Sequence, residues 1–99
     1  MSITYLGHTQ AKSDHIETLR HFLVTQVLPS VRASEGNESC QMFQSQTDPS
    51  QFVVIEVWAS VEAHRASIKN IPPESINQYL TLVAAPPNGS YYDTLTVSD

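Results

Sequence analysis

The sequence predicts an α+β domain of the ferredoxin-like type, in which a split βαβ chain order builds an antiparallel sheet covered by helices. Two observations carry this prediction. The expected elements follow the order strand, helix, strand, strand, helical segment, strand, which is the chain order of that fold. The length of 99 residues and the hydrophobic content of 40% suit one globular core, so we expect a single domain over residues 1–99.

The first third of the chain is predicted to form a strand and then a long helix. Residues 3–9 are rich in β-branched and aromatic side chains, which favour a strand. Ser13 is predicted to cap the helix, because a serine hydroxyl can accept from a free N–H of the first turn. Pro29 has no N–H to donate to the preceding turn, so we expect a kink or loosening near Leu28. Apolar residues recur at helical spacing at Ile16, Leu19, Leu23, Val27 and Val31.

The middle of the chain is predicted to form a β-hairpin. Residues 39–46 form its first strand, with Cys40, Met42 and Gln44 on one face. The segment 47–50 contains an Asp-Pro pair and turns the chain. Residues 52–58 are apolar on both faces and rich in β-branched types, which is typical of a strand covered on both sides.

The last third is predicted to hold two helices and a strand. Ser60 can cap a short helix that runs to about Lys69, and Pro73 can occupy the first position of another. The apolar face of this second helix carries Ile76, Tyr79, Leu80 and Val83. Residues 90–97, with two tyrosines, a leucine and a valine, are predicted to be the last strand.

The predicted sheet has one face that its own helices leave open. Helices in this arrangement cover one face, yet the segment 52–58 is apolar on both. A domain of about 100 residues also buries a smaller share of its surface than a large one does. We therefore expect a homodimer in which a second copy covers Val53, Ile55 and Val57.

Charge and composition disfavour several classes of partner. The net charge is −5, the isoelectric point is near 5.1, and the five Lys and Arg residues are scattered. Nucleic-acid and anionic membrane partners are therefore not expected. Cys40 is the single cysteine, and His15 and His21 lack the spacing of a ligand pair on one helix, so no metal site is expected. The first residues show no basic or long apolar stretch, which predicts a cytoplasmic protein.

Several short segments together resemble one known family. They are Arg32 four residues before Gly36, Asp48-Pro49 in the hairpin, Glu56-x-Trp58 at the end of a strand, Ser60-Val61-Glu62-Ala63 at a helix start, and Ala85-Pro86-Pro87. This combination is similar to the antibiotic biosynthesis monooxygenase family. The resemblance implies a dimeric α/β barrel, in which two sheets pack face to face and each subunit holds a small-molecule cavity between sheet and helices. The family hosts several functions, so chemistry has to be argued from the site.

Two branches of that family differ from this chain at particular positions. In members that degrade haem, polar residues stand where this chain has Gly7 and Ile68, so we do not expect haem or another cofactor. In members that oxygenate polycyclic hydroxyaromatic compounds, a Trp acts with an Asn four residues before it and a Tyr six after it. Trp58 matches the Trp here, while the other two positions hold Val54 and His64.

Three residues are the main candidates for a site. Glu56 and Trp58 share one strand face, where a carboxylate among apolar side chains is costly unless it is paired or protonated. Glu56 is either a proton acceptor or a structural group, paired with Arg32 or Arg65 or anchoring the first helix. Trp58 is either an aromatic wall for a planar ligand or part of the core.

His64 is predicted to face inward on the short helix, since it stands three residues after Val61 and four before Ile68. Its imidazole is suited to accept a proton from a phenol or enol near neutral pH, although it can equally be a rim residue without a role in chemistry. Further candidates for substrate contact are Val54 as a wall, His8 as a second polar group, and Phe22 and Tyr79 as either core or pocket residues.

The sequence therefore favours a cofactor-independent monooxygenase that acts on a small planar phenolic or quinol-like substrate, with His64 or Glu56 as the base. Two alternatives stay open. One is an isomerase or small-ligand-binding module on the same scaffold. The other is a non-catalytic structural dimer, which is favoured if internal partners fully occupy Glu56 and Trp58.

Overall fold

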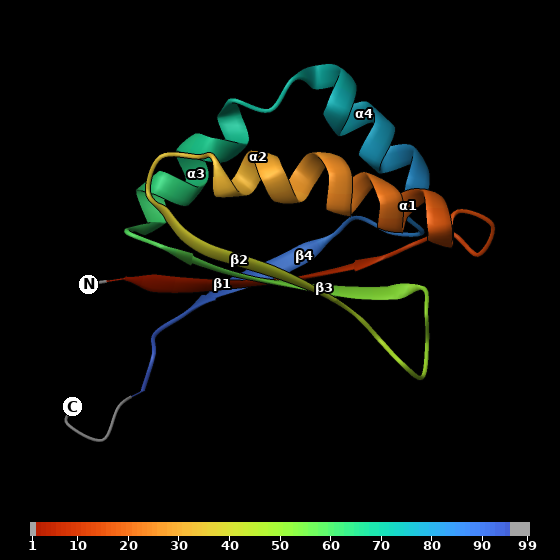
Figure 1. The fold of residues 1–99 in the computed structure, drawn as a ribbon, viewed down its shortest axis with the longest axis horizontal. Helices are drawn as coiled ribbons and strands as arrows, with labels where there is room; N and C mark the ends of the chain where they lie inside the picture. The colour runs from red at the N-terminus through yellow and green to blue at the C-terminus, as the bar shows by residue number, and fades with distance from the viewer. Residues whose placement is uncertain (1, 96–99) are drawn as a thin grey trace.

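The computed structural model describes residues 2–95, which form a four-stranded antiparallel sheet with helices on one side (Figure 1). The strands are β1 (Ile3–Gln10), β2 (Asn37–Gln44), β3 (Gln51–Trp58) and β4 (Asn88–Tyr92). The helices are α1 (Ile16–Phe22), the π-helical segment η1 (Leu23–Val27), α2 (Leu28–Arg32), α3 (Val61–Lys69) and α4 (Pro73–Leu82). The sheet order β2-β3-β1-β4 is that of the split βαβ arrangement, so the predicted ferredoxin-like α+β fold is confirmed.

The first helix begins later than predicted, and it loosens next to Leu28 as predicted. The residue before α1 is His15, which makes no side-chain capping bond, so the prediction that Ser13 caps this helix is wrong. The backbone N–H of His15 instead donates to the carbonyl of Lys12 in a turn, and this turn places Ser13 outside the helix. The Leu28 N–H donates to the carbonyl of Leu23, five residues back, which is the π-helical pattern. The helix thus loosens in the turn that ends at Leu28, directly before Pro29, which confirms the predicted loosening there.

The hairpin and the two later helices follow the predicted pattern with shifted boundaries. β2 starts at Asn37, because an irregularity between Asn37 and Ser39 lets the strand pair two residues earlier than expected. The Ser60 hydroxyl accepts from the N–H of Ala63 at 3.1 Å and so caps α3 as predicted. β4 ends at Tyr92 instead of reaching residue 97, and residues 96 and 97 of the predicted strand lie outside the described part.

Gly36, in the turn before β2, has a positive φ of 86°, a conformation that favours glycine. A Cβ at this position would also lie 2.6 Å from the Cβ of Ala63 in α3, so the absence of a side chain lets the turn approach that helix.

The two faces of β3 have different environments. Phe52, Glu56 and Trp58 are buried against the helices, while Val53, Ile55 and Val57 point to the other face and stay half-exposed. No described element covers that second face (Figure 1). Leu6 of β1 pairs with Ile55, and Phe43 of β2 pairs with Val53, so both lie on this open face. Phe43 is 47% exposed. The core on the helix side joins the first helix, β3 and the end of α4 through Ala11, Leu19, Phe22, Leu23, Phe52, Leu82 and Val83.

The open face predicts a homodimer in solution. The mass of the wild-type protein measured by light scattering should be twice the chain mass of 11.0 kDa. Ile55→Glu should raise the dissociation constant of the dimer by roughly 100-fold or more, because it places an unpaired charge in the interface, at a cost of about 3 kcal/mol or more. Gln78→Glu adds the same charge on exposed α4 and should leave the mass unchanged. A wild-type mass of one chain at micromolar concentration would refute this prediction.

Candidate active site

The helix-facing row of β3 places Glu56 and Trp58 in the interior. Trp58 is fully buried and Glu56 is 6% exposed. The indole N–H of Trp58 donates to Oε1 of Glu56 at 2.8 Å. This bond joins two residues of the same strand face. The indole N–H of the buried Trp58 therefore has a carboxylate of the site as its partner.

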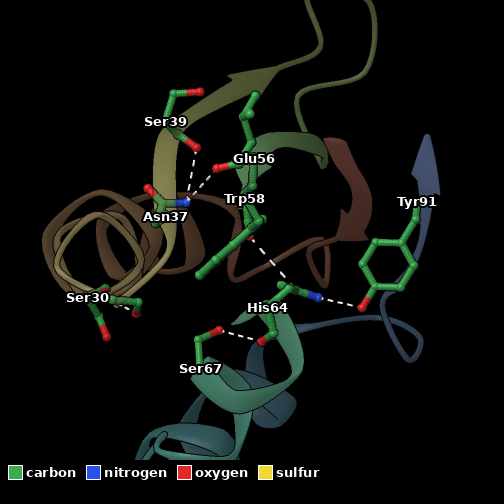
Figure 2. A network of polar contacts seen from close by, with 10 residues as sticks. Ser30, Asn37, Ser39, Glu56, Trp58, His64, Ser67 and Tyr91 are labelled. Atoms are coloured by element: carbon green, nitrogen blue, oxygen red, sulfur yellow. Dashed lines mark hydrogen bonds and ion pairs between the residues drawn. The ribbon is translucent and has the colours of Figure 1, made fainter. Parts of the chain in front are cut away.

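His64 lies on α3 and is enclosed by aromatic and polar side chains (Figure 2). Its Nδ1 and the hydroxyl of Tyr91 on β4 are 2.7 Å apart, within hydrogen-bond distance. Its Nε2 is 3.8 Å from Oε1 of Glu56. The ring stacks on that of Tyr5, with centroids 4.2 Å apart, and meets the Trp58 indole edge-on at 5.4 Å. The predicted inward position of His64 is confirmed. Contacts on several sides fix the orientation of its ring.

Two polar atoms of this group have no hydrogen-bond partner among residues 2–95. Nε2 of His64 is too far from Glu56 for a direct hydrogen bond, and Oε2 of Glu56 has no hydrogen-bond partner among residues 2–95. No fully buried side-chain nitrogen or oxygen in that part of the chain lacks a partner. Both atoms therefore retain exposed surface, and both residues line the same cavity. A molecule in this cavity can reach the imidazole and the carboxylate.

Burial changes the proton affinity of both groups. It raises the pKa of Glu56 above the ordinary 4.5, and the hydrogen bond from Trp58 acts in the opposite direction. Burial lowers the pKa of His64 below the ordinary 6.5, and the nearby positive charge of Arg65 adds to this. The imidazole is consequently neutral at physiological pH, which is the form that can accept a proton.

A cavity of about 490 Å³ lies between the sheet and the helices. This volume is within the range of about 300–1,000 Å³ found for small-molecule sites. Val54, Phe22 and Tyr79 line it, and the Phe22 and Tyr79 rings stack with centroids 6.2 Å apart. Among the described residues, its wall contains no Lys or Arg.

Two of the residues predicted to contact the substrate, Trp58 and His8, do not point into the cavity. Trp58 does not line the cavity, because Glu56 and His64 stand between the indole and the open space. His8 borders the cavity, but it pairs in register with Val53, so strand alternation directs its side chain to the open face of the sheet. The imidazole of His8 is therefore remote from that of His64.

The two arginines that we considered as partners of Glu56 bind elsewhere. The guanidinium of Arg32 donates to the backbone carbonyl of Cys40 at 2.9 and 3.2 Å, and Arg65 lies 6.0 Å from the centre of the Tyr91 ring. The salt bridge considered for Glu56 is therefore wrong for both. Burial raises the pKa of the Cys40 thiol to about 11, so this cysteine is unsuited to be a nucleophile.

Sequence reasoning missed Tyr5 and Tyr91 as site residues. They face each other across β1 and β4, and their rings lie 5.5 Å apart on the helix side of the sheet. Strand alternation assigns each tyrosine to one face of its own strand, but it does not say which residues of the other strands lie beside it. The register that aligns Tyr5 with both Glu56 and Tyr91 is a tertiary property, so no local signal indicated the cluster.

In residues 2–95, no group of three or more His, Cys, Asp or Glu side chains is arranged to hold a metal ion. Within the same range, none of the helices has the length and apolar character needed to cross a membrane.

Comparison with known proteins agrees with this fold. The family model for antibiotic biosynthesis monooxygenases matches residues 2–84. The chain therefore belongs to the antibiotic biosynthesis monooxygenase family, as the sequence resemblance implied. No curated protein matches.

Solved structures of similar fold have low sequence identity to this chain. A protein of Nitrosomonas europaea named as an antibiotic biosynthesis monooxygenase has a TM-score of 0.82 at 21% identity, over 97% of this chain and 92% of that one. Rv0793 from Mycobacterium tuberculosis has a TM-score of 0.78 at 20% identity, over 100% of both chains. A variant of SnoaB, a cofactor-independent oxygenase from Streptomyces nogalater, has a TM-score of 0.79 at 11% identity, over 99% and 98%. At these identities the comparisons establish the fold alone.

The buried carboxylate predicts a particular pH dependence of stability. The folded-state pKa of Glu56 is raised, so between pH 4.5 and that raised value the folded protein binds more protons than the unfolded chain does. The contribution of Glu56 to the free energy of unfolding should therefore be fully present below pH 4.5 and fall as the pH rises through this window. Glu56→Gln removes the titration, so the stability difference between wild type and variant should shift toward the variant with rising pH.

Urea unfolding of the two proteins from pH 4 to 8 measures this difference. Glu62→Gln makes the same change on the exposed side of α3 and serves as the matched control. A Glu56→Gln difference that is independent of pH, or that moves toward wild type, would contradict the raised pKa.

Proposed function

We propose that this chain is a cofactor-independent monooxygenase that acts on a small planar phenolic or quinol-like substrate. The observation that supports this most is the position of His64, whose imidazole lines an apolar cavity with its Nε2 3.8 Å from a buried carboxylate. Membership in the antibiotic biosynthesis monooxygenase family supports an oxygenase of this general kind. The apolar cavity and the two polar groups at its end support a planar phenolic or quinol-like substrate.

His64 is the proposed general base. With the proton on Nδ1, the imidazole donates to the Tyr91 hydroxyl and leaves the Nε2 lone pair free for the substrate. When Nε2 accepts the substrate proton, the ring becomes an imidazolium cation. The Glu56 carboxylate beside it then stabilises the new charge, in the way that a carboxylate orients and supports a catalytic histidine.

The oxygen step follows from the electron-rich anion that this proton transfer creates. An activated ring methylene that has lost a proton to His64 can transfer an electron to dioxygen and then form a carbon–oxygen bond. For such a methylene the balance is CH₂ plus O₂ giving C=O plus H₂O, so one oxygen atom stays in the product and the other leaves as water. The protein contributes the base, the orientation of the planar ring, and a cavity whose apolar wall excludes water.

An isomerase on the same scaffold is the second candidate. A base that removes a proton next to a carbonyl can return it to another carbon, and the same His64 and Glu56 arrangement serves that reaction. The two candidates differ in oxygen consumption. The structural-dimer alternative is favoured if internal partners fully occupy both Glu56 and Trp58. The indole N–H of Trp58 is occupied, and the free Oε2 of Glu56 argues against this alternative.

The proposed base predicts the pH profile of turnover. Enzyme-dependent oxygen uptake with an anthrone or quinol substrate should rise with pH, because only the neutral imidazole accepts a proton. The midpoint of kcat/KM should lie below pH 6.5, since burial lowers the pKa of His64. An oxygen electrode measures uptake after subtraction of the uncatalysed rate. A profile that falls with pH, or wild-type protein without uptake on any phenolic substrate, would refute the assignment.

A substitution separates the proposed base from a structural residue. His64→Ala should lower kcat by about 100-fold or more, because general-base catalysis contributes roughly 10² to 10⁴ in rate. His21→Ala, on the exposed side of α1, removes an imidazole far from the cavity and should leave kcat unchanged. Circular dichroism confirms that both variants fold. Undiminished uptake by folded His64→Ala protein would exclude His64 as the base.

A further inference from the structure

Three tyrosines border the cavity and its polar end, and their hydroxyls have different partners. The Tyr79 hydroxyl donates to Oγ1 of Thr9 at 2.8 Å, and the Tyr91 hydroxyl pairs with Nδ1 of His64. Tyr5 lines the cavity, and its hydroxyl has no hydrogen-bond partner among residues 2–95. Since no fully sealed side-chain oxygen in that range lacks a partner, the Tyr5 oxygen is accessible. A phenol with a free donor therefore stands at the cavity wall.

The surrounding backbone holds this phenol in place. Gly7 and Gly89 pair across β1 and β4 on the helix-facing side of the sheet, and neither carries a side chain. A Cβ on Gly89 would lie 2.1 Å from the Tyr5 oxygen, and one on Gly7 would lie 3.1 Å from Cε2 of the same ring. The two glycines thus leave the space in which the Tyr5 ring lies. Stacking on His64 at 4.2 Å restricts the ring from its other side.

We propose that Tyr5 is a substrate-binding residue whose hydroxyl donates a hydrogen bond to an acceptor oxygen of the substrate. The proposal deepens the proposed function, because it rests on a planar oxygen-bearing ligand that lies beside His64. It also defines the ligand further, as an uncharged molecule with a carbonyl or phenolic oxygen at the end that meets the Tyr5 and His64 pair.

The electrostatics of the cavity support this role. No Lys or Arg is present among its described lining residues, so an anionic group on the ligand would find no positive partner there. Burial raises the pKa of Tyr5, and the negative charge of Glu56 raises it further. The phenol is therefore protonated across the physiological range and remains a donor. A donor beside the base also stabilises the negative charge that develops on the substrate oxygen when its proton leaves.

The position of Tyr5 distinguishes it from the other hydroxyls near the cavity. The hydroxyls of Ser67 and Ser34 donate to the backbone carbonyls of His64 and Ser30, at 2.6 and 2.9 Å. The Thr9 hydroxyl accepts the bond from Tyr79. Tyr5 alone combines a free hydroxyl with direct stacking on the proposed base.

A pair of ligands that differ by one oxygen tests the proposal. 9-Fluorenone and fluorene are planar, uncharged and of similar shape, and only the ketone accepts a hydrogen bond. Equilibrium dialysis gives the dissociation constants for wild type, Tyr5→Phe and Tyr92→Phe. Tyr92 is 53% exposed on the opposite face of the sheet, so its variant is the matched control for loss of a phenolic hydroxyl. Neither ligand has to react, so binding is measured apart from turnover.

Tyr5→Phe should weaken fluorenone binding by about 3- to 10-fold, the effect of losing one hydrogen bond, and should leave fluorene binding within a factor of about two. Tyr92→Phe should change neither. Equal weakening of both ligands would assign Tyr5 to packing and overturn the proposal, and so would unchanged fluorenone binding or wild-type protein that binds neither ligand.

The oxygen electrode separates this inference from the proposed function. Selective loss of fluorenone affinity in Tyr5→Phe, together with wild-type protein that consumes no oxygen, would support the role of Tyr5 and refute the monooxygenase. Oxygen uptake by wild type without any selective loss would refute the role of Tyr5 alone.

Discussion

The site depends on how a carboxylate is held in the interior of a small domain. Glu56 is 6% exposed on a strand whose other inward residues are apolar or aromatic. Burial of an unpaired carboxylate is costly, and the indole N–H of Trp58 is its direct donor at 2.8 Å. One oxygen is thereby satisfied and the other stays at the cavity. Trp58 is thus bonded to the carboxylate beside it and does not line the cavity.

Local backbone features determine where the cavity lies. The sheet surface beneath the helices carries Gly7 and Gly89 next to the large side chain of Tyr5, so the ring lies between these glycines and His64 of α3. The first helix widens in the π-helical segment η1, three of whose residues, Leu23, Gln26 and Val27, line the cavity. π-helical turns are frequent at functional sites, and this one lines the cavity together with Val54 of β3.

The polar groups at this end of the cavity form an ordered series from three strands and one helix. Tyr91 of β4 meets one nitrogen of His64, Glu56 of β3 lies near the other, and Tyr5 of β1 covers the face of the ring. These contacts fix a single imidazole orientation before any ligand enters, which favours catalysis because less rearrangement is needed during the reaction. The three solved structures compared above are 11 to 21% identical to this chain and share its fold. The arrangement of these four polar residues is therefore described for this chain alone.

The order of the elements and the inward positions of Glu56, Trp58 and His64 were predictable from the sequence, because strand alternation and helical spacing are local properties. The short helix could be placed through Ser60, since capping depends on residues three apart. Strand register, in contrast, is decided by how distant segments pack. It brought Tyr5 and Tyr91 to His64, directed His8 to the opposite face, and left Arg32 bonded to a backbone carbonyl instead of to Glu56. Residues far apart in the chain meet only after the sheet has closed, so only the tertiary structure could decide which polar groups share the cavity.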